Sequence, residues 1–528
     1  MSEPVMLVLG LALAVALGIV SKRLALPYPI VFMVAGTVLA FVPGLPPVRI
    51  NPDWIFLSVL PPLLFAGGWS TDLTLFQANL RPILVLAIGL VIASTVAVAV
   101  LAERLVPGLG WASAFVLGAI VSPPDAVAAI ATFERFQVPR RIVAVLEGEG
   151  LVNDATSLVL YGFAVAAVVA GGFSPLQAAG SFVVVAVGGI LVGIVIELGI
   201  ERLTRALNTH DLTDSLIDNL IIIATPYAAY LSAQALHVSA VLATVVAGIR
   251  LGRRSPVVYS PETRLVATSV WTTWIYIINA YVFLVLGLQL RSFEGHHLLA
   301  LLPAALAISA LLIVVRLAWI VPTAWLPRAL SRRLRERDPL PPWSWLFVIG
   351  WTGMRGIVSL AAALALPYVM RDGAPFPGRD AIVFITFVVI FVTLVGQGLS
   401  LIPLVKWLKL GRDENDGEER EIEVRIAALE AGVREIADLS AQAQDDEERR
   451  IVERLRGEYV HRIDHLRGHG IRGRTEETAE SEFDHHAQSE ALRAERREIA
   501  RLRSRGEIPD DLFRRIQYDL DLAEARMF

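Results

Sequence analysis

Long runs of apolar residues, separated by short stretches rich in Arg, Pro or Gly, occupy the chain up to about residue 410. A helix that crosses a membrane needs about 20 mainly apolar residues, because the hydrocarbon is about 30 Å thick and a helix rises about 1.5 Å per residue. The runs therefore predict about thirteen spanning helices. We expect them at residues 5–21, 28–43, 54–68, 82–102, 111–133, 141–170, 178–200, 216–235, 238–252, 267–290, 298–326, 342–368 and 379–405.

The basic residues between these runs predict the orientation. If the N-terminus lies outside, the inner loops carry seventeen Lys and Arg residues and the outer loops carry five. Lys and Arg favour cytoplasmic loops. We therefore expect a multi-pass protein of the cell (inner) membrane, with the N-terminus outside and the C-terminus in the cytoplasm.

Composition and charge divide the chain into two parts. Apolar residues make up 55% of the 528 residues and charged residues 19%, against about 25% charged in soluble proteins. There is no cysteine, which excludes disulfide-stapled secreted domains and thiol catalysis. From Gly411 onward, 21 arginines and 31 acidic residues give a net charge of −10. We predict a membrane domain at 1–410 and a charged, regulatory cytoplasmic tail at 411–528.

The tail is predicted to be largely helical. Apolar residues recur at three and four positions in 421–439 and 489–508, among dense opposite charges, which is typical of amphipathic solvated helices. The stretch 461–486 breaks the pattern, so we expect a flexible linker there. Its clustered histidines (His461, His465, His485 and His486) are either solvated or a metal site.

A few ionisable side chains lie inside the predicted spanning helices, where a charge is costly and therefore points to function. In the fifth helix, Ser122, two prolines and Asp125 follow one another near the middle. Consecutive prolines remove backbone donors and break a helix, and irregular backbone at membrane depth occurs where it lines a cavity or contacts other protein. A plain kink explains the prolines but not the carboxylate.

The sixth helix carries Glu149, Asn153 and Asp154. Asp154 has apolar neighbours, so its side chain cannot extend to water. A carboxylate that titrates near neutral pH binds either a proton or a small cation, but not both, and this competition is what an exchanger requires. The alternative is that Asp154 pairs permanently with Arg355 or Arg316 and only joins helices.

Two interrupted segments occupy corresponding places in the two halves: 122–125 in the fifth helix and 350–356 in the twelfth. Paired interruptions are typical of inverted repeats in secondary transporters. The predicted fold class is an all-α polytopic membrane protein with inverted repeats, two interrupted crossing helices and a cytoplasmic helical tail.

These residues resemble the monovalent cation/proton antiporter-1 family, the bacterial sodium/proton antiporters related to animal sodium/proton exchangers. The resemblance covers nearly the whole membrane part, and its most specific elements are the Asn-Asp-Ala run at 153–155 and the Gly-Met-Arg-Gly run at 353–356. The matching stretches occur in family order, at 60–69, 125–162, 238–254, 279–290 and 351–367.

The resemblance implies exchange of Na⁺ (or Li⁺ or K⁺) for H⁺ by alternating access, in pH and cation homeostasis. Asp154 and Asp125 would bind the cation and the proton, with Asn153 and Ser122 beside them. Glu149 and Arg355 fall on the family's buried salt bridge. The family also implies a homodimer in the lipid bilayer, with no cofactor and no nucleic-acid partner, and an unknown effector is a candidate for the tail.

The chain departs from the family pattern at three places. Pro124-Asp125-Ala126 stands where the family has Thr-Asp-Pro, Gly150 stands where it has Ser, and Ala66 stands where many members have a carboxylate. Ser122, Ser157 or water are the candidate replacements for the lost ligands. Because Asn153 cannot titrate, we expect one exchangeable proton on this helix and electroneutral exchange.

Three other function classes fit the sequence less well than exchange does. An enzyme would need a nucleophile with a base, or metal ligands, but the membrane histidines lie near helix ends, away from Asp154. A channel would need a continuous polar pore or a carbonyl-rich filter, whereas the polar residues form one cluster. A transporter-like sensor would use the tail as its output. We expect a transporter and not an enzyme.

Overall fold

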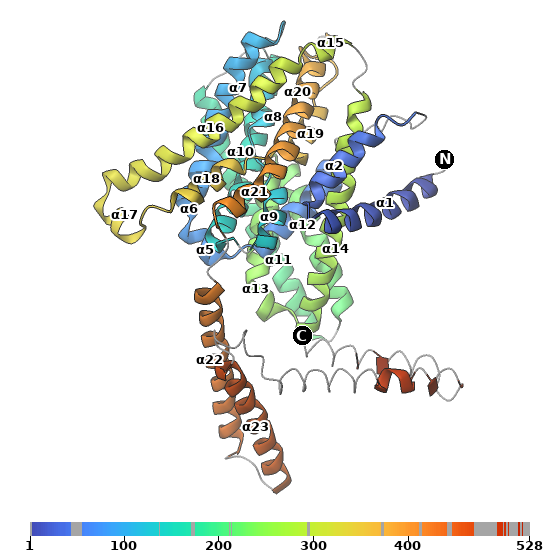
Figure 1. Ribbon diagram of the computed structural model, residues 1–528, viewed down its shortest axis with the longest axis vertical. Coiled ribbons are helices and arrows are strands. Elements are labelled where there is room, and N and C mark those ends of the chain that lie inside the picture. Colours follow the sequence, from blue (N-terminus) through green and yellow to red (C-terminus); the bar gives the residue numbers. More distant parts are fainter. Residues whose placement is uncertain are drawn as a thin grey trace. The chain divides into compact units, whose positions relative to one another are not determined.

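The computed structural model of the chain is helical (Figure 1). It describes residues 3–43, 55–136, 138–170, 175–210, 212, 214–292, 296–370, 374–410, 414–440 and 446–468, and near the end 494–499, 501–502, 505, 516–517 and 520. Within these residues the only β-type pairing is one isolated bridge between Val369 and Pro375. The chain divides into two compact units, Met1–Arg412 and Asp413–Phe528.

The first unit contains the apolar helices. In chain order they are α1 (Glu3–Leu24), α2 (Tyr28–Leu39), η1 (Ile55–Val59), α4 (Leu60–Ser70), α5 (Leu73–Ala78), α6 (Leu80–Leu84), η2 (Val85–Leu90), α7 (Val91–Leu105), α8 (Trp111–Val121), α9 (Val127–Phe136), α10 (Arg140–Ala170), α11 (Pro175–Thr209), α12 (Ser215–Ala235), α13 (Ala240–Val258), α14 (Pro261–Leu288), η3 (Gln289–Ser292), α15 (His296–Leu299), α16 (Leu302–Leu330), α17 (Arg332–Arg337), α18 (Trp343–Trp351), α19 (Ile357–Leu364), α20 (Arg379–Phe391), η4 (Val392–Gln397) and α21 (Gly398–Trp407).

Seven continuous helices among the described residues are long and apolar enough to cross a membrane, and three shorter apolar helices accompany them. The sequence-based boundaries are close for several of them: the run predicted at 141–170 is α10, and the run predicted at 379–405 is the continuous helix formed by α20, η4 and α21. The run predicted at 178–200 was too short, because α11 continues to Thr209. The protein is therefore an all-helical, multi-pass membrane protein.

Two of the predicted helices are interrupted in the middle. The α8 helix ends at Val121, and α9 begins at Val127. The prolines at 123 and 124 lack the backbone N–H groups that would continue the helical hydrogen bonds. The α18 helix ends at Trp351 and α19 begins at Ile357, with glycines at 353 and 356 in the gap. Each break therefore leaves two half-helices with unpaired ends.

Glycines allow several helices to approach closely. A Cβ atom at Gly36 of α2 would overlap the carbonyl oxygen of Leu284 in α14, and one at Gly287 would overlap the carbonyl oxygen of Met33. Small residues at such contacts are typical of helix pairs in membranes, where close backbone packing replaces the hydrophobic effect. Any larger residue at Gly36 or Gly287 would therefore push the backbones of α2 and α14 apart.

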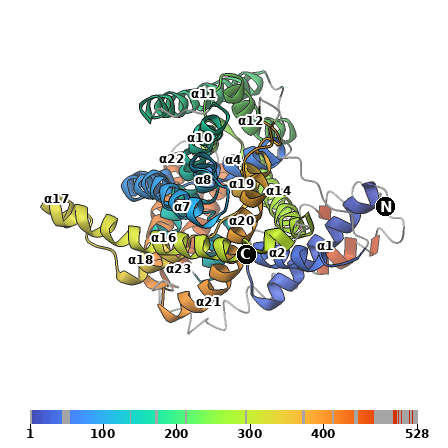
Figure 2. The same ribbon diagram turned by 90° about the horizontal axis from the view of Figure 1, so that it is seen from above.

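The largest apolar core surrounds the two breaks. Buried residues of α2, α8, α9, α14, α16, α19 and α20 contribute to it. Figure 2 shows α7, α8 and α16 together on one side of this unit and α11 and α12 together on another. The breaks thus lie inside packed protein, where irregular backbone is tolerated in a membrane.

In the second unit, α22 (Glu414–Ser440) packs against α23 (Asp446–Gly468). Arg467 forms an ion pair of 2.6 Å with Glu430, and the ring of Tyr459 lies against Gly432, so the two helices are antiparallel. The predicted helix at 421–439 lies within α22. The linker predicted at 461–486 was wrong for 461–468, which continue α23, whereas 469–486, with His485 and His486, lie outside the described residues.

Candidate functional site: two broken helices and their carboxylates

The two helix breaks contact each other directly. The backbone N–H of Asp125 donates to the carbonyl oxygen of Met354 at 2.6 Å. In an unbroken helix, that N–H group would donate to the carbonyl of Val121, four residues earlier. Instead, the Val121 carbonyl accepts a hydrogen bond of 3.0 Å from Nε of Arg355. Each break therefore satisfies backbone groups that the other leaves unpaired.

The Asp125 carboxylate lies at the beginnings of two half-helices. Its Oδ1 accepts a hydrogen bond of 2.9 Å from the N–H of Val127, the first residue of α9. The N–H of Ile357, the first residue of α19, also donates to this carboxylate. Helix N-termini carry partial positive charge and bind anions. A Cβ atom at Gly356 would overlap the carboxylate, so only glycine at 356 permits this approach.

Asp154 lies on α10 and is the least constrained carboxylate of the site. Asp125 is near enough to act on it electrostatically. Within the described residues, no hydrogen bond or ion pair to the Asp154 carboxylate is found. Both carboxylates are only partly buried. Asp154 is thus free to bind a cation or a proton, and the alternative of a permanent pair with Arg316 or Arg355 is not what the structure shows.

Asn153 connects α10 to the first break. Its Nδ2 donates to the carbonyl oxygen of Pro124 at 2.8 Å, while its Oδ1 is buried and has no hydrogen-bond partner among the described residues. A buried amide oxygen without a donor costs free energy unless an ion or water satisfies it. The Asn153 side chain therefore both holds the break and offers an oxygen ligand.

Ser122 lies at the end of α8 with its hydroxyl group engaged. Its Oγ donates to the carbonyl oxygen of Gly118 at 2.5 Å and accepts a hydrogen bond of 3.0 Å from Oγ1 of Thr95 on α7. Ser157 on α10 donates to the carbonyl oxygen of Ala119 at 2.9 Å. The Ser122 hydroxyl group therefore joins the end of α8 to α7, and the Ser157 hydroxyl group joins α10 to α8.

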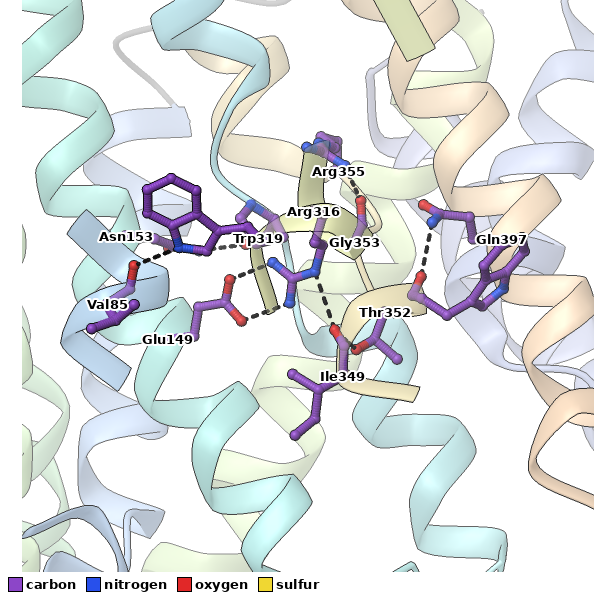
Figure 3. Close-up of polar contacts among 12 residues, drawn as sticks. Val85, Glu149, Asn153, Arg316, Trp319, Ile349, Thr352, Gly353, Arg355 and Gln397 are labelled. Atoms are coloured by element: carbon purple, nitrogen blue, oxygen red, sulfur yellow. Dashed lines mark hydrogen bonds and ion pairs between the residues drawn. The ribbon is translucent and has the colours of Figure 1, made fainter. Parts of the chain in front are cut away.

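The prediction that Glu149 pairs with Arg355 was wrong. Glu149 forms a two-pronged ion pair with Arg316 of α16, with distances of 2.5 Å for Nη1–Oε1 and 2.7 Å for Nη2–Oε2 (Figure 3). Nε of Arg316 also donates to the carbonyl oxygen of Ile349 at 3.2 Å. The side chains of Arg316 and Glu149 are 1% and 2% exposed. Planar two-point pairing satisfies a buried carboxylate and a buried guanidinium together.

Arg355 binds backbone groups at the helix breaks, which explains why it does not pair with Glu149. Its guanidinium donates to the carbonyl oxygens of Val121 and Gly353, and its backbone N–H donates to Oγ1 of Thr393 at 3.1 Å. A cation at the C-terminal end of a helix is favourable, so Arg355 closes the end of α8. The guanidinium of Arg355 is bonded to backbone carbonyl groups at the breaks, and Glu149 therefore pairs with Arg316.

Polar residues of the last spanning helix also belong to the site, and the sequence analysis missed them. Oγ1 of Thr393 accepts a hydrogen bond from the backbone N–H of Arg355. Nε2 of Gln397 (Figure 3) donates to the carbonyl oxygen of Trp351 at 2.8 Å, at the end of α18. They stand four positions apart in an apolar run, and that spacing places them on one helix face. This isolated polar pair was the sequence signal for them.

Comparison with known proteins decides the family. The sequence pattern of the family described as "Sodium/hydrogen exchanger, transmembrane" matches residues 9–407, which is more than half of the chain. The chain belongs to the sodium/hydrogen exchanger family.

Curated relatives agree with the family match, and a solved structure has a similar fold. An uncharacterized Na⁺/H⁺ exchanger of Mycobacterium tuberculosis is 32% identical over 98% of this chain and 95% of its own length. A sodium, potassium, lithium and rubidium/H⁺ antiporter of Bacillus subtilis is 34% identical over 70% of this chain and 56% of its own length. The structure of the sodium proton antiporter MjNhaP1 from Methanocaldococcus jannaschii superimposes with a TM-score of 0.56, at 17% identity, over 77% of this chain and 98% of that one.

Proposed function

We propose that this exchanger moves Na⁺, with Li⁺ or K⁺ as alternative substrates, against H⁺, and that Asp154 and Asp125 bind the two substrates in turn. The observation that carries the proposal is the unpaired Asp154 carboxylate, whereas the other charged side chains of the site have partners. Glu149 is paired with Arg316, Asp125 is held by backbone N–H groups, and Arg355 is bonded to backbone carbonyls. The relatives are transporters, which favours this function over that of an enzyme.

Competition at Asp154 supplies the coupling. A monovalent cation needs several oxygen ligands, and the carboxylates of Asp154 and Asp125 with Oδ1 of Asn153 are the candidate protein ligands. Protonation of Asp154 removes its negative charge and therefore its attraction for the cation. Because only one of the two substrates binds at a time, transport of one in each direction follows if the loaded site can face either side.

The architecture proposed for that alternation has about thirteen membrane crossings arranged as inverted repeats, with the breaks of α8–α9 and α18–α19 as corresponding elements. Contact between the two breaks supports this arrangement, since transporters with inverted repeats place such segments together at the substrate site. We propose a homodimer in the cell membrane, with the N-terminus outside and the C-terminus in the cytoplasm. The basic loops favour this orientation.

The remaining features concern energetics and regulation. Asn153 cannot titrate, so one proton against one monovalent cation is proposed, which makes the exchange electroneutral. The second unit carries an acidic excess and helices without the apolar faces of spanning segments. We propose that it regulates exchange through an effector, in the service of pH and cation homeostasis.

The test is exchange by the full-length protein in proteoliposomes that enclose a pH-sensitive dye. Adding Na⁺, Li⁺ or K⁺ in turn should collapse a preset pH gradient in the wild type. Asp154→Asn keeps size and polarity but removes the titrating group, so it should abolish the response while the protein still inserts. Asp380→Asn, at a carboxylate that is 81% exposed, is the matched control and should keep wild-type exchange. Cation-driven proton movement in purified Asp154→Asn above the protein-free background would refute the assignment.

A further inference from the structure

The helices α5, α6, α16 and α18 lie at one side of the first unit (Figure 1). A cavity of about 480 Å³ lies between them and α10. None of Asp154, Asp125 and Asn153, the three proposed ion ligands, lines it. Its wall is largely apolar, with side chains that include Leu86, Val145, Ile320 and Leu346. Ligand pockets in proteins commonly measure about 300–1,000 Å³, so the cavity has room for part of a hydrocarbon chain.

The charged residues of the cavity lining carry an excess of positive charge, and we call this part of the lining the mouth because Arg81 is exposed. They are Arg81, Arg141 and Arg328, together with a single acidic residue, Asp338. The two carboxylate oxygens of Asp338 accept from Nη2 of Arg141 at 2.8 Å and from Nη2 of Arg328 at 2.5 Å. Arg81 is exposed, and no ion-pair partner for it is found in the part of the chain that the structure describes. Three guanidinium groups against one carboxylate leave two positive charges that favour an anion.

The chain on either side of the mouth has the character of a membrane interface. Next to lining residues in the sequence, Trp325 is 58% exposed and Trp343 is 62% exposed. Leu330 and Leu340 are also exposed, at 79% and 49%. Tryptophan is enriched at the level of the lipid headgroups. An apolar cavity that opens there beside guanidinium groups matches a molecule with an anionic head and an apolar tail.

We propose that this cavity binds one acidic phospholipid, with its phosphate held by Arg81 and Arg141 and part of an acyl chain along the apolar wall. Basic pockets between membrane helices on the cytoplasmic side are suited to lipid phosphates, and guanidinium groups bind phosphate with strong, charge-assisted hydrogen bonds. Binding of this lipid does not depend on the proposed transport function.

The cavity wall is directly connected to the buried ion pair. Ile349 lines the cavity, and its carbonyl oxygen accepts from Nε of Arg316. Val85 also lines it, and its carbonyl oxygen accepts a hydrogen bond of 3.3 Å from Nε1 of Trp319, which lies one turn after Arg316 (Figure 3). A lipid in the cavity therefore braces the backbone that holds the Glu149–Arg316 pair and stabilises the folded membrane unit.

The test is thermal unfolding of the purified full-length protein in a neutral detergent, followed by tryptophan fluorescence during titration with lipid. Dioctanoylphosphatidylglycerol should raise the Tm in a saturable manner. Two probes separate the contributions of the acyl chains and of the anionic headgroup. Dioctanoylphosphatidylcholine has the same chains without net negative charge, and glycerol 3-phosphate has the anion without chains. Both should leave the Tm unchanged. Equal stabilisation by either probe would overturn the proposal, in favour of non-specific lipid binding or of a soluble-anion site.

Three variants localise the binding. Arg81→Gln should weaken the apparent affinity for phosphatidylglycerol by about fivefold, since a basic residue near a lipid surface contributes about 1 kcal/mol. Ala324→Phe fills the cavity from α16 and should abolish saturable stabilisation. Arg140→Gln, at an exposed arginine that does not line the cavity, is the matched control and should bind as the wild type does. If Arg140→Gln weakens binding as much as Arg81→Gln, diffuse surface charge explains the effect and the proposed site is wrong. Should Ala324→Phe fail to fold, the comparison of the two arginine variants still decides.

Discussion

Replacing Glu149 by Gln should destabilise the membrane unit strongly, because it leaves the buried charge of Arg316 without its counter-charge. Two of the guanidinium nitrogens donate to the carboxylate at 2.5 and 2.7 Å, and the side chains of Arg316 and Glu149 are 1% and 2% exposed. A glutamine amide has one acceptor oxygen, so one N–H group of Arg316 also loses its acceptor. Breaking a buried ion pair at one partner costs about 3–5 kcal/mol.

A second, exposed ion pair in the same unit gives a comparison for the expected loss of stability. Arg332 and Glu336 form an ion pair of 2.9 Å, but their side chains are 83% and 61% exposed. Exposed pairs contribute at most about 1 kcal/mol. Glu336→Gln should therefore cost less than a third of the loss in Glu149→Gln, although the two substitutions are chemically identical. Burial is the difference between the two sites.

A double-mutant cycle measures the pairing itself. The purified variants Glu149→Gln, Arg316→Gln and their combination are unfolded at equilibrium by a denaturing detergent, and the free energies of unfolding are compared. The combination should recover part of the two single losses, because removing both charges of a buried pair can be nearly neutral. Strictly additive losses would refute the pairing. A second cycle with Arg355→Gln should give a smaller coupling to Glu149, and a larger one would restore the partner that the sequence suggested.

Four further outcomes are expected. Gly356→Ala should insert but lose exchange in proteoliposomes, because its Cβ would overlap the Asp125 carboxylate; unchanged exchange would mean that this carboxylate is not needed where it lies. Gly150→Ser should fold normally, since the nearest atom to its Cβ would be Cβ of Ala126 at 3.8 Å, and it should lower the Na⁺ concentration for half-maximal exchange; a Km equal to that of the wild type would show that the added hydroxyl group does not reach the cation. Removing the chain after Arg412 should keep exchange but alter its pH or effector dependence, whereas a well-inserted but inactive truncation would make the tail part of the transport machinery. Exchange should not respond to a potential set with K⁺ and valinomycin when Na⁺ is the substrate, although 100 mV is worth about 2.3 kcal/mol per charge moved; a clear shift of the equilibrium would show that a second proton is carried.

The positions of the helices and of their interruptions could be predicted from local sequence. Apolar runs of membrane length and the prolines at 123 and 124 act through the backbone of their own segment, so no knowledge of the partners was needed. The same holds for Asp154 as a candidate: a carboxylate among apolar neighbours on α10 is exceptional wherever the helix packs. The tail was less predictable. Residues 461–468 continue α23, because packing against α22 supports a segment whose own pattern is weak.

Which charged groups meet was decided by the tertiary structure alone. Glu149, Arg316 and Arg355 lie on three different segments, and the sequence offers two basic partners for one carboxylate without the distances that would separate them. Glu149 lies on α10, and both α10 and α16 pack against η2 and α18. This packing brings Arg316 opposite Glu149. The broken end of α8 leaves carbonyl groups that only a nearby donor can satisfy, and Arg355 is that donor.

The sequence by itself determined that the chain is helical, crosses a membrane, breaks two of its helices and carries an unusual carboxylate at position 154. Each of these follows from the hydrophobic effect or from the chemistry of residues a few positions apart. The structure alone decided that the two breaks satisfy each other's backbone, that Asp125 lies at the N-termini of α9 and α19, and that Thr393 and Gln397 support the site. Apart from the local bond between Asp125 and Val127, those contacts join residues 38 to 232 positions apart in the chain. Their formation depends on how whole helices pack rather than on any local pattern.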